Sequence, residues 1–155
     1  MSRRTVNRAS AKLVDGFFSS MSAMGRALPS STPARHAVEH IQDLSYGPHP
    51  HGNRLDIYRP MKVEKSRPVV LYIHGGGFRS LSKESHWIMG LIFARRGYVV
   101  VNINYRLAPK HPYPAAIEDA CSAWLWNHIV MSSVIIFRLS GTDSKFRKVQ
   151  RMRST

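Results

Sequence analysis

The sequence has few of the residues that stabilise small domains covalently or through metals, and it has no long apolar run. Cys121 is the only cysteine among the 155 residues, so an intramolecular disulfide is excluded and a zinc site cannot be built on cysteine. The longest apolar stretches, Val99–Ile103 and Val134–Phe137, fall well short of the roughly 18–20 residues that cross a bilayer. We therefore predict no membrane span, no metal and no cofactor, and an ordinary small apolar role for Cys121 on a helix.

Acidic residues are scarce, and the resulting positive charge is concentrated at the two ends. The chain has 23 Lys and Arg against 9 Asp and Glu, a net charge of +14 at pH 7. Residues 1–35 contain six basic residues and one acid, and so do residues 138–155. Such ends could contact nucleic acid or an anionic membrane. Because neither end interleaves aromatic residues with its charges, we favour solvated, partly disordered ends and predict no specific nucleic-acid partner.

The first 37 residues form a basic, serine-rich segment that has two interpretations. Its composition fits an organellar transit peptide, and it lacks the apolar stretch of a secretory signal. Apolar residues recur in it at helical spacing, which instead indicates an amphipathic lid helix: Val6, Ala9, Leu13, Val14, Phe17, Phe18 and Met21. We favour the helix. We accordingly expect a cytoplasmic protein, with organellar targeting as the alternative.

Residues 38–126 predict a single α/β domain. Alternating patterns and near-continuous apolar runs predict four strands: Val38–Tyr46, Arg54–Tyr58, Pro68–Ile73 and Tyr98–Asn102. Apolar spacing predicts two helices: His86–Arg96 and Pro114–Trp126. The first two strands are separated by the turn-rich Gly47–Asn53, so they predict an antiparallel hairpin. The last two strands flank a helix, so they predict a right-handed parallel crossover.

The most informative motif is His74-Gly75-Gly76-Gly77-Phe78, which directly follows the third predicted strand. Glycines in this position let the backbone turn sharply and present bare N–H groups to a developing oxyanion. We predict Gly76 and Gly77 as the donors and Gly75 as the residue that enables the turn. His74 is predicted to hold the loop by hydrogen bonding rather than to act as a base. A Gly-rich turn without a ligand is the alternative. A phosphate-binding loop is not predicted, because the sequence motifs of such loops are absent.

Three segments together resemble the α/β-hydrolase esterases of the hormone-sensitive-lipase and feruloyl-esterase-like groups: His74–Phe78, Asn104–Pro109 and His111–Ala120. Asn53–Pro60 is similar to the edge strand of the same proteins. The resemblance runs from about Val38 to Trp126. It implies the N-terminal portion of an α/β-hydrolase sheet, a hairpin followed by a parallel βαβ unit, and a small-molecule carboxylic ester as substrate.

The resemblance also implies the roles of individual residues. Gly75, Gly76 and Gly77 would line the oxyanion hole. Tyr105, Arg106 and Pro109 would fix the loop after the fourth strand, and Glu118 and Asp119 would help to anchor it. A buried ion pair between Arg106 and Asp119 would lock this loop, with a solvated arginine as the alternative.

The sequence departs from the family where the nucleophile is expected. The family continues with Gly-Asp-Ser-Ala-Gly, and the 155 residues contain no Gly-x-Ser-x-Gly. Val134–Phe137 could supply the preceding strand, and Gly141–Ser144 follows it. Ser144, however, is one position too late, and Lys145 would obstruct the tight turn. We therefore predict no catalytic triad in this chain, which is truncated before the nucleophile elbow.

These observations divide the chain into three predicted segments. They are the N-terminal segment 1–37, a partial α/β-hydrolase domain at 38–126, and a divergent, poorly ordered basic tail at 127–155 produced by frameshift or truncation. The leading interpretation is a fragment of a serine hydrolase that is inactive alone. The alternative is a non-catalytic interaction protein that retains half of the fold. Without the missing strands, the last parallel strand would be an exposed apolar edge.

Overall fold

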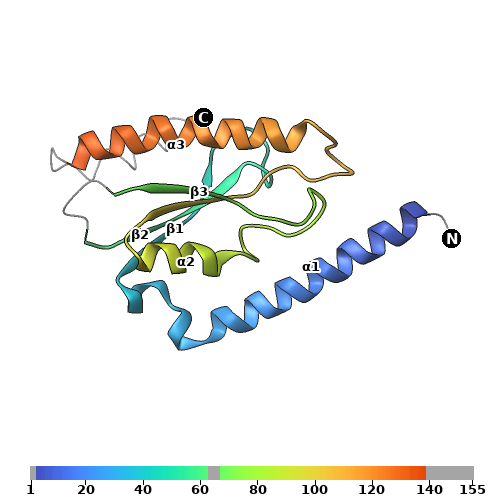
Figure 1. Ribbon diagram of the computed structural model, residues 1–155, viewed down its shortest axis with the longest axis horizontal. Helices are drawn as coiled ribbons and strands as arrows, with labels where there is room; N and C mark the ends of the chain where they lie inside the picture. The colour runs from blue at the N-terminus through green and yellow to red at the C-terminus, as the bar shows by residue number, and fades with distance from the viewer. Residues whose placement is uncertain (1–2, 63–66, 139–155) are drawn as a thin grey trace.

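The protein folds into a four-stranded mixed sheet with helices on both faces. The computed structural model describes residues 3–62 and 67–138. The elements in chain order are α1 (Arg3–Ala27), the 3₁₀ turns η1 (Pro29–Ser31) and η2 (Pro33–His36), β1 (Val38–Ser45), β2 (Arg54–Pro60), β3 (Val69–Ile73), α2 (Trp87–Arg95), β4 (Val99–Ile103) and α3 (Ala115–Arg138). Helix α3 lies along one face of the sheet, and α2 and α1 lie on the other (Figure 1).

The strand order is β1-β2-β4-β3. β2 pairs antiparallel with both β1 and β4, and β3 pairs parallel with β4. The predicted hairpin and parallel crossover are therefore confirmed, but the predicted edge is wrong. The last parallel strand, β4, lies between β2 and β3, and β3 is the edge of the sheet within the described ranges. The central place suits β4, because Val100–Ile103 is fully buried and needs neighbours on both sides, whereas Ile73 of β3 is partly exposed.

Two hydrophobic cores, one on each face of the sheet, follow from the alternation of side chains along β2 and β4. One core packs against α3: Leu44, Tyr46, Leu55, Ile57, Val101, Ile103, Ala123 and Trp126. The other packs against α2: Val38, Tyr58, Trp87, Leu91, Ala94 and Val100. Helix α2 approaches the sheet most closely at Gly90, where a Cβ atom would lie 2.4 Å from the Tyr58 ring. Burial on both faces explains why the central strand β4 reads as a nearly continuous apolar run.

Helix α3 extends further than the sequence predicted. It was expected to end near Trp126, and the backbone remains helical to Arg138. Val134–Phe137 is part of this helix, so the strand suggested there is wrong. The physical reason is the absence of any Gly or Pro between Ala115 and Arg138, which leaves nothing to stop the helix. Residues 139–155, Ser144 among them, lie outside the described residues.

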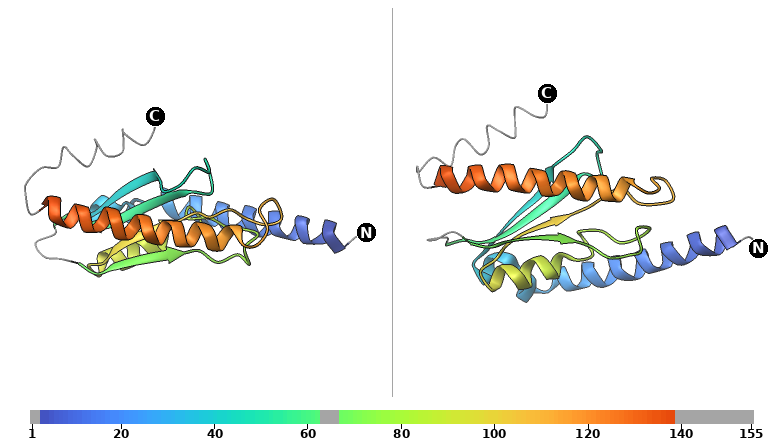
Figure 2. Two further views of the ribbon diagram at one scale, coloured as in Figure 1. Left: turned by 90° about the horizontal axis from the view of Figure 1, so that it is seen from above. Right: turned by 45° about the horizontal axis from the view of Figure 1, so that its top comes forward.

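The predicted N-terminal helix is present as α1, which two further views show projecting beyond the sheet at its N-terminal end (Figure 2). Its assignment as a lid or as a targeting segment stays a prediction. Among the described residues, none of the helices combines the length and apolar character needed to span a membrane.

Candidate active-site loop

The glycine motif leaves β3 at the carboxyl end of the strand and turns tightly. Positive φ values occur at Gly76 (107°), Gly77 (59°) and Phe78 (60°). The Gly76 carbonyl accepts hydrogen bonds from the amides of Arg79 and Ser80 at 3.1 and 3.2 Å, and from the Ser80 hydroxyl at 3.0 Å. A Cβ atom on Gly76 would lie 2.0 Å from the Ser80 carbonyl oxygen. Gly76 is therefore required both by its backbone conformation and by lack of space.

The turn leaves several backbone donors unengaged, and the two amides that the sequence predicted as oxyanion donors are among them. Within residues 3–62 and 67–138, the amides of Gly76 and Gly77 donate to no protein acceptor. Such amides are available to an oxygen of a bound ligand, and a negatively charged oxygen is the acceptor that they favour most. The loop can thus serve as a small anion-binding site made of backbone alone.

His74 and Tyr105 hold the base of the loop. The Tyr105 hydroxyl donates to the His74 carbonyl at 2.8 Å, and the two rings stack with centroids 4.4 Å apart. His74 Nδ1 donates to the Gly75 carbonyl at 2.7 Å. Burial lowers the pKa of His74, so its ring is neutral at pH 7. On the far side of the loop, the Ala108 amide donates to the Phe78 carbonyl at 2.8 Å, so the segment after β4 contacts the loop twice.

Arg106 connects the segment after β4 to helix α3. Its backbone amide and its Nε both donate to Asp119, at 2.8 and 3.0 Å, and its Nη2 lies 2.9 Å from a Glu118 carboxylate oxygen. Burial alone would raise the pKa of Asp119, but the hydrogen bonds from Arg106 outweigh it and hold that pKa below its usual range. The structure contains the ion pair that the resemblance implied, with Asp119 buried and the Arg106 side chain 26% exposed.

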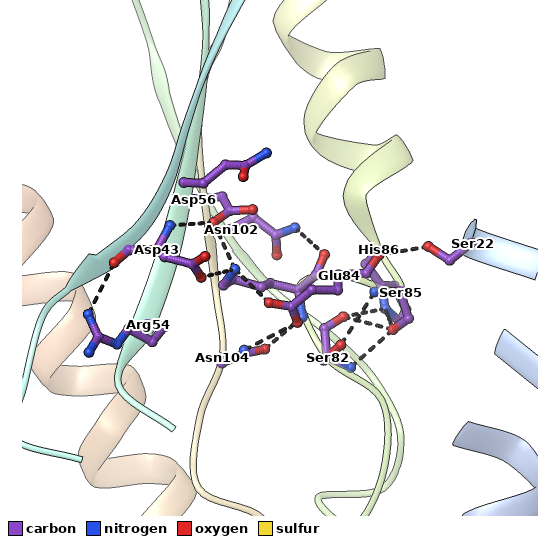
Figure 3. Close-up of polar contacts among 12 residues, drawn as sticks. Ser22, Asp43, Arg54, Asp56, Ser82, Glu84, Ser85, His86, Asn102 and Asn104 are labelled. Carbon is purple, nitrogen blue, oxygen red and sulfur yellow. Dashed lines mark hydrogen bonds and ion pairs between the residues drawn. The ribbon is translucent and has the colours of Figure 1, made fainter. Parts of the chain in front are cut away.

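A second charged cluster is centred on a lysine that follows the glycine loop in the chain. The sequence did not predict this cluster. The Lys83 ammonium contacts Asp43 and Asp56 at 2.8 Å each and Glu84 at 2.6 Å (Figure 3). Only 2% of the Lys83 side chain is exposed. Burial alone would lower its pKa, but hydrogen bonds to the three carboxylates raise it above the usual range. The ammonium group is therefore permanently charged.

This Lys83 cluster also fixes the chain that follows the glycine loop. The Lys83 amide donates to the Asn104 side chain at 2.7 Å, and the Asn102 side chain donates to the Lys83 carbonyl at 3.0 Å. Asp56, on β2, accepts hydrogen bonds from His40 and from the Asp43 amide as well. Both ends of the loop segment are thus attached to the sheet, one through Tyr105 and the other through Lys83.

Comparison with known proteins finds a similarity to esterases. The BD-FAE family model matches residues 55–129. Carboxylesterase NlhH of Mycobacterium tuberculosis is 41% identical over 71 residues, which cover 45% of this chain and 22% of that protein. Tuliposide A-converting enzyme b1 of Tulipa gesneriana is 38% identical over 81 residues, which cover 48% of this chain and 22% of that enzyme. The chain thus spans about a fifth of the length of these relatives.

Solved structures give the same result. A bacterial heroin esterase superposes with a TM-score of 0.63 at 25% identity, covering 82% of this chain and 38% of its own. The chain is similar in sequence to α/β-hydrolase esterases and shares part of their fold. An esterase from Pyrobaculum calidifontis superposes with a TM-score of 0.52 at 33% identity, over 76% of this chain and 36% of its own. The match covers only part of each of these esterases. This agrees with the sequence motifs, which predicted the N-terminal part of the fold.

The structure brings together the residues that the esterase resemblance selected. His74 and Gly75 contact Tyr105 directly, and Arg106 with Asp119 secures the neighbouring segment. The members of the Lys83 cluster were missed, although a signal was present. Asp56 and Asn102 are polar residues inside otherwise apolar strands, and buried polar groups need partners. In the described portion of the chain, no group of three or more His, Cys, Asp or Glu residues could hold a metal ion.

Proposed function

We propose that residues 74–78 form the oxyanion-binding loop of a site that hydrolyses carboxylic esters. The observation that carries this proposal is the pair of unengaged amides, at Gly76 and Gly77, in a turn held rigidly at the carboxyl end of β3. An ester carbonyl attacked by a nucleophile becomes a tetrahedral oxyanion, and these amides would donate to it. Each such donor typically contributes about 3 kcal/mol to the stability of the transition state. Gly75, whose carbonyl accepts from His74 and Tyr105, would keep the two donors in place.

We further propose that this chain alone does not turn over esters. The family's reaction needs a serine on a nucleophile elbow and a histidine that acts as its base. No Gly-x-Ser-x-Gly occurs in the 155 residues, and His74 is buried against Tyr105 as a neutral, hydrogen-bonded ring. Without a nucleophile to attack the ester carbonyl, no oxyanion forms for the loop to stabilise.

Hydrolysis of 4-nitrophenyl acetate and butyrate by the 155-residue chain tests the second proposal. We expect no release of 4-nitrophenol above that of a heat-denatured sample. Saturable turnover that a serine-directed phosphonate inhibitor abolishes would contradict it, and would point to a serine that the sequence motifs do not reveal.

The role of the loop is tested in a complete esterase. A chimera carries the aligned 71 residues of this chain in place of their counterparts in the Mycobacterium tuberculosis carboxylesterase. We expect it to hydrolyse 4-nitrophenyl butyrate, and Gly76→Ala to lower its kcat by about 100-fold or more with little change in KM. Gly97→Ala is the matched control, because Gly97 also has a positive φ (94°) but lies at the end of α2, away from the loop. Equal kcat values for the two variants would contradict the proposed role.

A further inference from the structure

Helix α1 contacts the chain that follows the glycine loop. Asp15 accepts a hydrogen bond from the Leu81 amide at 2.5 Å, and Ser22 donates to the Glu84 carbonyl at 2.7 Å. Arg26 donates to the same carbonyl. These three side chains lie on the polar side of the helix, because they are seven and four positions apart. Helix α1 therefore reaches the chain at two points, and Asp15 makes the contact that is nearer to the glycine loop in the sequence.

Two strained backbone positions follow the three glycines. Phe78 and Leu81 have φ values of 60° and 71°, in the left-handed region that residues other than Gly, Asn and Asp rarely adopt. Such conformations persist only where the surrounding structure holds them. Phe78 is held by the Ala108 amide, which donates to its carbonyl at 2.8 Å. Leu81 is held separately, because the hydrogen bond from its own amide goes to Asp15.

The backbone amides of residues 79–83 all donate to protein acceptors. Four of these five amides donate to groups in the same loop or just after β4, and those acceptors are the Gly76 carbonyl, the Ser85 hydroxyl and the Asn104 side chain. The exception is the Leu81 amide, whose acceptor Asp15 lies 66 positions away in the sequence. Without Asp15, this amide would lose its protein acceptor, and the strained conformation of Leu81 would lose the contact that fixes it.

The peptide group between Ser80 and Leu81 connects Asp15 to the glycine loop. Its N–H end donates to Asp15. Its carbonyl end lies against Gly76, where an added Cβ atom would be only 2.0 Å from the Ser80 oxygen. Because a peptide group is planar, a rotation of one end moves the other. A change of conformation at Leu81 would therefore disturb Gly76, whose amide is one of the two oxyanion donors, and Gly77 beside it.

We propose that Asp15 is a positioning residue for the amide donors of Gly76 and Gly77, and that it acts through the Leu81 amide. This role in ester hydrolysis rests on the function proposed above for residues 74–78. Asp15 acts on the loop and not on the ester. Its carboxylate fixes the amide of a strained residue, and the turn is thereby kept in the single conformation that presents both donors.

Backbone nitrogen relaxation, measured by NMR on the 155-residue chain, tests this role. We expect the order parameters of the Gly76 and Gly77 amides to be about 0.85, as in a rigid backbone, and to fall to about 0.6 in Asp15→Ala. The matched control is Ser19→Ala, at an exposed serine of the same helix, and it should leave both values unchanged. Unchanged values in Asp15→Ala would overturn the proposal.

Two further variants test the route through Leu81. Asp15→Asn keeps an oxygen that accepts from the Leu81 amide, so its order parameters should match those of the original chain, and a fall as large as in Asp15→Ala would overturn the proposal. Leu81→Gly removes the strain, because glycine adopts positive φ readily. In that background, Asp15→Ala should change the amide chemical shifts of Gly76 and Gly77 less than it does in the original chain. Equal changes in both backgrounds would exclude the route through Leu81.

The amide of Ser22 reports whether α1 itself stays in place. We expect its order parameter to remain about 0.85 in Asp15→Ala, because Ser22 keeps its contact with the Glu84 carbonyl. A fall at Ser22 equal to that at the loop glycines would overturn the proposal, since Asp15 would then only dock the helix. None of these measurements involves an ester. They are therefore judged apart from the Gly76→Ala chimera, whose failure would contradict the oxyanion role alone.

Discussion

Lys83 and Arg106 both fix segments around the glycine loop through carboxylates, but they do so in different surroundings. The Lys83 side chain is 2% exposed and contacts carboxylates from β1, from β2 and from its own loop. Arg106 is 26% exposed, and both of its carboxylates, Glu118 and Asp119, come from the first turns of α3. One cation connects three separate parts of the chain, and the other connects two.

The contribution of an ion pair to stability depends on how deeply its charges are buried. A charge removed from water depends on its partners, so deleting one member leaves another buried and uncompensated. A charge that keeps part of its hydration loses less, because water replaces the missing partner. The Lys83 cluster should therefore control the stability of the whole sheet, while Arg106 should control mainly the segment after β4.

The largest effect is expected from Lys83→Ala. Asp56 is buried, and without Lys83 its negative charge would keep only the His40 side chain and the Asp43 amide as partners. We expect the free energy of unfolding, measured by urea titration, to fall by about 3–5 kcal/mol. Lys12→Ala, at an exposed lysine, is the control and should change it by less than about 0.5 kcal/mol. A loss below about 1 kcal/mol for Lys83→Ala would show that the cluster is well hydrated and would remove the contrast with Arg106.

A smaller effect is expected from Asp119→Asn. This change keeps the shape of the side chain but removes the charge that accepts from the Arg106 amide and guanidinium. We expect a loss of about 1.5–3 kcal/mol, the usual range for a hydrogen bond to a charged group. Hydrogen exchange should increase mainly in residues 104–109. Glu118→Gln removes the exposed partner of the same arginine and should cost less than about 0.5 kcal/mol, so similar losses for both variants would contradict the role given to burial.

The smallest effect concerns pH. Burial lowers the pKa of His74, so the folded chain binds this proton less readily than the unfolded chain does. The free energy of unfolding should therefore decrease as the pH falls below about 6.5, the ordinary pKa of histidine. His74→Asn should reduce this decrease in urea titrations that span roughly one pH unit on either side of that value. An unchanged decrease would mean that other histidines cause it.

Carboxylates control the free energy of unfolding in a second, more acidic pH range. Hydrogen bonds outweigh burial at Asp56, Glu84 and Asp119 and lower the pKa of each group. Their contribution to stability is present above the ordinary carboxylate pKa of about 4 and is lost as the pH falls through the folded-state values. His74→Asn should leave this acidic loss unchanged, which separates the two ranges.

The sequence predicted local structure well where one pattern decides it. The apolar runs predicted both β3 and β4, although only β4 is buried. The glycines of residues 75–77 predicted the turn between β3 and α2. The Arg106–Asp119 contact was expected from the family resemblance, and the structure has it. Lys83 gave no such signal, because its partners Asp43 and Asp56 are far from it in the sequence and meet it only across the sheet.

The amino-acid sequence by itself determined most of the elements, the tight turn at Gly76 and the resemblance of the chain to α/β-hydrolase esterases. These depend on residue types and on spacings of a few positions, which act locally on the backbone. Only the tertiary structure decided that β4 enters between β2 and β3, that Lys83 is buried among three carboxylates, and that α1 turns its polar side inward. Each of these depends on which distant surfaces exclude water together, and that is a property of the folded chain as a whole.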